Sequence, residues 1–265
     1  MTINDVTYLS VYGNDLGKKK NSDIESISRL ANADNAILDF AKRRVFTHKA
    51  PSTFYNNVEY IQIPEIAYED FSEFVILYYP QMFDSEFMLN FHCDGFIANP
   101  DSWTDIFLRY DYVGAPFDAG GYQHQICSGN GGFSLRSKKF CTELRDVYLQ
   151  SRNYLKSLEN PNEQEDIISC YLLREELEKR GVRFAPFEVA SLFCTEHLAY
   201  TDRDFYKSFG IHEISPASKK RVKENIFNKE HVKYACRNHR KTTQARRKIQ
   251  KKIFSFCNFK EKNSS

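Results

Sequence analysis

The sequence of 265 residues contains no run of 18 or more apolar residues, so we expect no membrane-spanning helix. Its first residues show no basic segment followed by an apolar one, and we therefore expect no secretory signal. The seven cysteines form no Cys-x-x-Cys pair and their number is odd, which argues against a zinc site or a disulfide framework. These absences favour a reducing compartment, and we expect a cytoplasmic protein.

The composition is that of a folded protein. Hydrophobic residues make up 42% and aromatic residues 15% of the chain, enough to build a sizeable core and to exclude disorder of the whole chain. The net charge of +2 conceals an asymmetry. Residues 219–262 carry sixteen Lys and Arg against three acids, a net charge of +13, so the remainder carries −11. We expect a domain at 1–216 followed by a basic, helical tail at 217–265.

The basic tail has three possible roles. Lys and Arg with interleaved Phe suit an anionic membrane surface, which would place the protein on the inner face of the membrane. The same composition suits nucleic acid, which is bound through its backbone charge. The tail could instead pack back on the acidic body. Membrane binding is the interpretation we prefer.

Strand and helix patterns alternate through the first half of the chain, and this predicts an α/β fold with a mixed, mostly parallel sheet flanked by helices. The expected strands, which alternate or are apolar throughout, are 6–13, 58–66, 86–97 and parts of 101–117 and 182–196. The expected helices are 21–43, 70–83, 138–156 and 164–181. Residues 118–137 are expected to form a glycine-rich loop, and residues 206–216 to close the globular part.

Four positions combine polar chemistry with a place at the end of an element. Asp94 ends the apolar run 86–97, where an α/β sheet binds its ligands, and it suits either a divalent cation or a turn. The glycines of 129–132 allow close approach to a sugar or phosphate, or form a hairpin, and they match neither a Walker loop nor G-x-G-x-x-G. Glu165 and Asp166 could supply a base or simply favour a helix N-terminus. His212 could bind metal or be a partly buried His.

Taken in order, six motifs resemble a known family. They read D-G-F-I-A-N-P-D-S-W at 94–103, Y-D-Y-V-G-A-P at 110–116, G-N-G-G-F-S-L-R-S at 129–137, E-D at 165–166, V-R-F-A-P at 182–186 and F-G-I-H at 209–212. The family is glycosyltransferase-like, and its usual first motif reads Q-x-D-G-F. More distantly, C-S-G-N-G-G-F-S-L-R at 127–136 is similar to the C-S-G-G-G-Y-V-L-S segment of fringe and β-1,3-galactosyltransferase-type enzymes.

This resemblance implies a GT-A-like, Rossmann-type fold and a nucleotide-sugar donor, often a UDP-sugar. It also implies a divalent cation, usually Mn²⁺ with Mg²⁺ as the alternative, and transfer with inversion at the anomeric carbon. Carried over to this sequence, Asp166 would be the base with Glu165 supporting it, and Asp94 and His212 would hold the metal. The first acid of the D-x-D motif is replaced by His92, which leaves one carboxylate and a possible His ligand.

The donor would contact further residues. Gly131, Gly132 and Asp94 would lie beside its sugar and diphosphate, and Val11, Tyr12 and Gly13 at the end of the first strand would hold the base and ribose. We therefore expect a cytoplasmic hexosyltransferase that acts on a hydroxyl of a surface polysaccharide or lipid-linked glycan. The alternatives are a glycosyltransferase acting on modified DNA, with the tail on the duplex, and a non-catalytic nucleotide-sugar-binding module.

Overall fold

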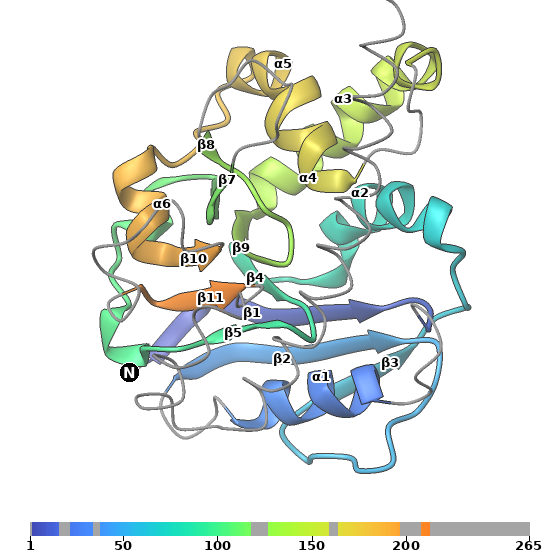
Figure 1. Ribbon diagram of the computed structural model, residues 1–265, viewed down its shortest axis with the longest axis vertical. Helices are drawn as coiled ribbons and strands as arrows, with labels where there is room; N and C mark the ends of the chain where they lie inside the picture. Colours follow the sequence, from blue (N-terminus) through green and yellow to red (C-terminus); the bar gives the residue numbers. More distant parts are fainter. Residues whose placement is uncertain are drawn as a thin grey trace, which may run out of the picture.

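The computed structural model describes residues 2–15, 22–33, 38–117, 127–158, 164–196 and 208–212. Its centre is a six-stranded sheet in the order β3-β2-β1-β4-β9-β6 (Figure 1). These strands are β1 (Thr2–Tyr12), β2 (Asp39–Thr47), β3 (Glu59–Gln62), β4 (Phe87–Phe91), β6 (Tyr112–Gly114) and β9 (Phe133–Ser137). Strands β3, β2, β1 and β4 run parallel, whereas β9 is antiparallel to both of its neighbours.

Two smaller sheets accompany the central one. The first has the order β10-β11-β5 and consists of β5 (Gly95–Ile97), β10 (Cys194–Glu196) and β11 (Gly210–His212). The second pairs β7 (Pro116–Phe117) with β8 (Cys127–Ser128). Because β5 follows β4 after only three residues, the chain leaves the central sheet and enters the small one through a single turn. That turn carries His92 and Asp94.

The helical segments lie on both faces of the central sheet (Figure 1). The α-helices are α1 (Ser22–Ala33), α2 (Phe71–Met82), α3 (Lys138–Lys156), α4 (Glu165–Ile167), α5 (Arg174–Lys179) and α6 (Phe187–Phe193). Short 3₁₀ segments are η2 (Tyr68–Asp70), η3 (Pro100–Ser102) and η4 (Phe107–Arg109), and the π-helical segment η5 (Ile168–Leu172) joins α4 to α5. In the described part of the chain, no helix combines the length and the hydropathy that crossing a membrane requires.

The two faces of the central sheet bury separate hydrophobic clusters. Along β1, Val6 and Tyr8 point to the face covered by α1 and the small sheet, whereas Leu9 and Val11 point to the face covered by α2 and α3. Side chains of a strand alternate between faces, so a strand buried on both sides must be apolar at nearly every position. Residues 6–12 of β1 are accordingly all buried, and the only polar residues among them, apart from the tyrosine hydroxyls, are the small Thr7 and Ser10.

An aromatic cluster fixes the small sheet against the central one. The ring of Phe209, just before β11, lies between those of Trp103, Phe107, Phe133 and Phe193, with centroids 5.2–6.3 Å away. Gly210 allows this approach, because a Cβ there would lie 2.0 Å from the Phe133 ring. The buried aromatic contacts therefore set the position of β11, and with it that of His212.

The predicted fold class is confirmed: the chain forms a mixed, mostly parallel sheet with helices on both faces. Helix 138–156 is found at its predicted residues. The single helix predicted for 21–43 is wrong, because α1 ends at Ala33 and residues 39–47 form β2. Pairing with β1 along its length determines the structure of β2, and the local helical pattern did not contain this information.

Three other predicted elements are divided in the structure. The strand predicted for 86–97 is wrong, since β4 ends at Phe91 and β5 begins a second sheet at Gly95. The loop predicted for 118–137 ends earlier than expected, because 133–137 form the central strand β9. The helix predicted for 164–181 consists of α4, η5 and α5. The predicted basic tail and the domain boundary at 216 lie outside the described residues.

Candidate active site

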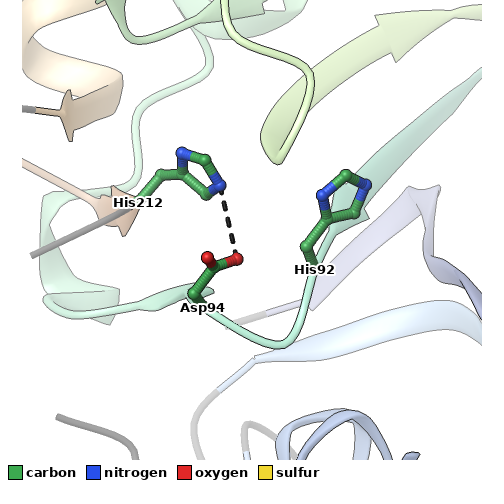
Figure 2. Close-up of side chains that lie close together, drawn as sticks. All are labelled: His92, Asp94 and His212. Carbon is green, nitrogen blue, oxygen red and sulfur yellow. Dashed lines mark ion pairs between the residues drawn. The ribbon is translucent and has the colours of Figure 1, made fainter. Parts of the chain in front are cut away.

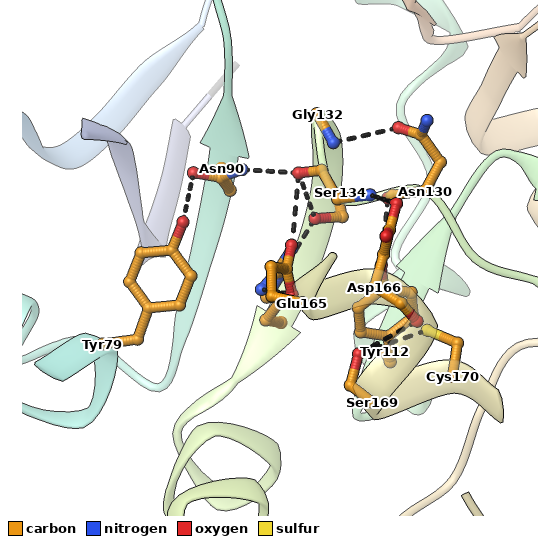
Figure 3. A network of polar contacts seen from close by, with 12 residues as sticks. Tyr79, Asn90, Tyr112, Asn130, Gly132, Ser134, Glu165, Asp166, Ser169 and Cys170 are labelled. Atoms are coloured by element: carbon orange, nitrogen blue, oxygen red, sulfur yellow. Dashed lines mark hydrogen bonds and ion pairs between the residues drawn. The ribbon is translucent and has the colours of Figure 1, made fainter. Parts of the chain in front are cut away.

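The loop at residues 129–132 connects β8 to β9 and forms the centre of the candidate site. Its carbonyl groups are held by side chains of the surrounding elements (Figure 3). Asn90 at the end of β4 donates to the carbonyl oxygen of Gly131 at 2.6 Å, and Tyr112 donates to that of Asn130 at 2.9 Å. Buried hydrogen bonds of this kind fix a loop, because releasing them leaves unpaired polar groups.

A buried ion pair supports one side of this loop. Arg136, on β9, is fully buried and donates to both carboxylate oxygens of Glu165, at 2.6 and 3.0 Å. Its guanidinium group lies 5.2 Å from the ring centroid of Tyr79 and 5.4 Å from that of Tyr112. The bidentate geometry and the aromatic rings compensate for the removal of both charges from water. Glu165 is therefore held in place, with its negative charge paired with the positive charge of Arg136.

Asp166, the next residue, has a different environment. Its Oδ2 accepts the Gly131 N–H at 3.0 Å and its Oδ1 accepts the Ile167 N–H at 2.9 Å. Burial and the charge of Glu165 raise the pKa of Asp166 to about 6, although these two hydrogen bonds oppose the shift. Within the described part of the chain, the hydrogen bonds to this carboxylate come from backbone N–H groups and not from a cation. A carboxylate of this kind with a pKa near neutrality is suited to accept a proton. Asp166, and not Glu165, thus has the properties of a base.

On the other side of the loop, three side chains form a cluster with metal-ligand character (Figure 2). His92, Asp94 and His212 each offer one ligand atom, and these atoms all lie within 4.8 Å of one another. His212 Nε2 is 3.4 Å from Asp94 Oδ1, and the two imidazole rings are 6.3 Å apart. The antiparallel pairing of β11 with β5, which places His212 opposite Gly95, brings the late His to the turn after β4.

The two histidines differ in electrostatics. Burial lowers the pKa of His92 to about 4, although the charge of Asp94 opposes this, so the imidazole is neutral and keeps a lone pair at neutral pH. Burial alone would also lower the pKa of His212, but Asp94 and Glu196 outweigh it and raise that pKa well above 6.5. A cation with two positive charges could replace the proton between His212 and Asp94. Two imidazoles and one carboxylate form a set of donors that suits a transition-metal ion.

The structure brings together most of the predicted residues. Asp166 and Glu165 lie against Gly131, and His212 lies against Gly132, so the loop connects the predicted base to the predicted metal ligands. A Cβ on Gly131 would lie 2.0 Å from Glu165 Oε1, and one on Gly132 would lie 2.0 Å from His212 Nε2. The space left by the missing side chains is thus filled by the protein. The donor-binding role of the two glycines stays a prediction.

The predicted nucleotide residues lie at the end of β1. Val11 is buried in the core, and Gly13 packs against Ile66, leaving no room for a side chain. Tyr12 donates its hydroxyl hydrogen to Asp15, which also pairs with Lys49. Because β1 and β4 are parallel neighbours, both strands end at the same edge of the sheet. Binding of a base or ribose there stays a prediction.

Three residues of the site were not predicted from the sequence: Asn130, Arg136 and Glu196. Asn130 has φ of 63° and links Glu196 to the loop. Arg136 and Glu196 each lie within or next to an apolar run, and a charged residue at such a position is rarely buried without a partner. This pattern was the available signal, but the partners come from distant segments.

The profile of one family, described as a protein of unknown function (DUF5672), matches residues 68–212, more than half of the chain. A comparison with curated proteins finds no match. Similar solved structures include three glycosyltransferases. The galactosyltransferase LgtC, in complex with donor and acceptor sugar analogs, is 14% identical, with a TM-score of 0.50 over 89% of this chain and 95% of that one. The likeness to LgtC shows the fold alone, and this fold is GT-A-like.

The other two structures have lower scores. A glycosyltransferase involved in glycosylation of the major capsid of PBCV-1 is 12% identical, with a TM-score of 0.46 over 78% of this chain and 92% of that one. The apo-form glycosyltransferase GlyE of Streptococcus pneumoniae TIGR4 is 10% identical, with a TM-score of 0.44 over 86% of this chain and 60% of that one.

Proposed function

The chain belongs to the DUF5672 family, and we propose that it is a metal-dependent glycosyltransferase that moves a hexose from a nucleotide diphosphate, a UDP-sugar, to a hydroxyl acceptor. One observation carries the proposal. Asp166, a buried carboxylate with a raised pKa, accepts a hydrogen bond from Gly131, and the candidate metal ligand His212 lies against Gly132, the next residue of the same loop. Sugar transfer from a diphosphate needs both a base and positive charge near the leaving group.

In the proposed reaction, Asp166 takes the proton from the acceptor hydroxyl. The acceptor oxygen forms a bond to the anomeric carbon while the bond from that carbon to the phosphate oxygen breaks, and the diphosphate leaves with the electron pair. Attack from the face opposite to the diphosphate inverts the anomeric carbon. Glu165, held by Arg136, keeps the pKa of Asp166 raised through its charge.

His92, Asp94 and His212 would hold the divalent cation, which supplies positive charge to stabilise the departing diphosphate. The nitrogen ligands favour Mn²⁺, because Mg²⁺ prefers a shell of oxygens and water. We further propose that the acceptor is a surface polysaccharide or lipid-linked glycan and that the protein acts in the cytoplasm at the inner face of the membrane. This part of the proposal rests on the composition of the basic tail.

Release of UDP tests the proposal. We expect the full chain to hydrolyse at least one sugar of a UDP-hexose panel slowly and faster with Mn²⁺. Asp166→Asn should slow the reaction by about 10²–10⁴-fold while UDP binding persists. Asp146→Asn, which changes a half-exposed carboxylate on α3, is the matched control and should behave as the wild type. Equal activity of Asp166→Asn and the wild type would remove Asp166 from the mechanism. Donor binding without any turnover would favour a non-catalytic binding module.

A further inference from the structure

The small sheet aligns three residues in one row. In its register, Glu196 on β10 lies opposite His212 on β11, and His212 lies opposite Gly95, the neighbour of Asp94, on β5. Glu196 is 3% exposed and His212 is 7% exposed, so the carboxylate and the imidazole meet away from bulk water. Charges interact strongly under these conditions. The imidazole of His212 therefore lies between two carboxylates, those of Asp94 and Glu196.

The ring uses a different nitrogen toward each neighbour. Nε2 is 3.4 Å from Asp94 Oδ1, and Nδ1 is 3.6 Å from Glu196 Oε1. The ring packs directly against the backbone of Gly132, where a Cβ would lie 2.0 Å from Nε2. It therefore has no room to swing toward the loop. The metal-facing nitrogen is thus Nε2, and Nδ1 is the nitrogen that the rest of the protein can address.

Asn130 fixes the position of Glu196. The Asn130 Oδ1 accepts the N–H of Gly132 at 3.0 Å, so its Nδ2 must face the other way. There it donates to Glu196 Oε2 at 2.6 Å and lies 3.0 Å from His212 Nδ1. The left-handed backbone of Asn130, with φ of 63°, is a conformation that Asn adopts more readily than most residues. Because the Asn130 amide holds Oε2 of Glu196, the other carboxylate oxygen, Oε1, faces Nδ1 of His212.

Two neighbours of Nδ1 have opposite effects. The amide of Asn130 would favour a lone pair on Nδ1, which puts the proton on Nε2 and blocks a metal. The carboxylate of Glu196 favours the proton on Nδ1, which leaves the Nε2 lone pair for the metal. With a cation on Nε2, the neutral ring must carry its proton on Nδ1. Of the two neighbours only the Glu196 carboxylate can accept a hydrogen bond from that proton, because the amide nitrogen of Asn130 can only donate.

We infer that Glu196 is a positioning residue: it keeps the proton on His212 Nδ1 and so directs the Nε2 lone pair to the cation held with Asp94 and His92. This inference rests on the proposed function, since it concerns the same metal cluster. Metal-bound histidines commonly donate their other N–H to a carboxylate, and loss of such a partner weakens metal binding by roughly 10–100-fold.

The test measures metal affinity and not turnover. Free Mn²⁺ is counted by electron paramagnetic resonance during titration of the wild type, Glu196→Gln and Asp111→Asn. Glu196→Gln keeps the shape and removes the charge, and we expect its Kd for Mn²⁺ to rise by about 10–100-fold. The matched control is Asp111, a buried carboxylate directly before β6 that accepts hydrogen bonds from the Ser137 hydroxyl and the Arg183 N–H. Its variant should bind Mn²⁺ as the wild type does.

A second measurement uses only the wild type and tests which nitrogen of His212 binds the metal, even if Glu196→Gln does not fold. Nitrogen NMR of ¹⁵N-histidine-labelled protein with Zn²⁺ should show His212 protonated at Nδ1 and metal-bound at Nε2. A proton on Nε2, or an unchanged Mn²⁺ affinity in folded Glu196→Gln, overturns the role of Glu196 and leaves the proposed function intact. A wild type that binds Mn²⁺ no better than Asp94→Asn overturns the metal cluster itself, and this inference with it.

Discussion

The loop at 129–132 separates two polar clusters that differ in how closely their groups are paired. On one side, Arg136 and Glu165 bond directly at 2.6 and 3.0 Å between two tyrosine rings. On the other, the ligand atoms of the His92, Asp94 and His212 cluster are within 4.8 Å of one another, and the one ion pair among them is 3.4 Å long. Ligands about 2.0–2.2 Å from an ion lie roughly 3–4 Å from one another.

This difference indicates two tasks. The paired cluster maintains the shape of the loop and contributes to the raised pKa of Asp166. In the spaced cluster the groups are farther apart, and we propose that an ion lies between them. Changes to the first should therefore lower the free energy of unfolding, and changes to the second should alter metal binding with little effect on the fold.

The largest expected effect comes from Arg136→Met. The variant leaves Glu165 buried without its cation, and removal of one partner of a buried pair costs about 3–5 kcal/mol of unfolding free energy. Urea denaturation measures this value. Arg180→Met is the control, because Arg180 pairs with Glu143 at the surface and such pairs contribute about 0.2–1 kcal/mol. Comparable losses in the two variants would show that the Arg136 pair has no special structural role.

Metal binding should stabilise the folded protein. At a concentration about 100 times its Kd, a cation that binds only the folded state adds about 2.7 kcal/mol. We expect Mn²⁺ to raise the Tm, Mg²⁺ to raise it less, and Asp94→Asn to abolish the Mn²⁺ shift while its own Tm without metal stays near that of the wild type. An Mn²⁺ shift that survives in Asp94→Asn would place the ion elsewhere.

Two adjacent glycines allow the same substitution to be made against each cluster. Gly131→Ala meets Glu165 Oε1, and Gly132→Ala meets His212 Nε2, both at 2.0 Å from the new Cβ. Overpacking of this kind costs about 1–3 kcal/mol. We expect Gly131→Ala to lower the urea midpoint more and Gly132→Ala to lower the Mn²⁺ affinity more. If both variants change both properties equally, the two clusters form one unit.

The sequence was sufficient for the parts of the fold and site that depend on local pattern. The β-rich run at β1, the apolar run at β4, the helix α3 and the polar residues after β4 could be recognised without partners. Strand β2 could not, because pairing with β1 and not local propensity determines it. Glu196 was missed for a related reason: its role depends on the pairing of β10 with β11, which places it opposite His212 and which no local pattern predicts.

The smallest expected effect is a pH dependence that separates Asp166 from the other acids. Its pKa is raised to about 6 by burial and by the charge of Glu165, so the base is ionised at pH 7 and becomes protonated as the pH falls through 6. The value of kcat/KM at saturating Mn²⁺ should therefore be level above about pH 7 and fall toward tenfold, about 1.4 kcal/mol, for each unit below 6.

Protonation of Asp166 would not lower kcat/KM by unfolding the protein. It removes a buried charge and so favours the folded state as the pH drops from 6 toward 4. Glu165→Gln removes the neighbouring negative charge that helps to raise the pKa of Asp166, so that pKa should fall. The acid limb of the profile should then move to lower pH in this variant, measured on protein that circular dichroism shows to be folded. An acid limb that stays in place would assign it to a group other than Asp166, and the metal-binding cluster, where a proton competes with Mn²⁺ for His212, would be the next to examine.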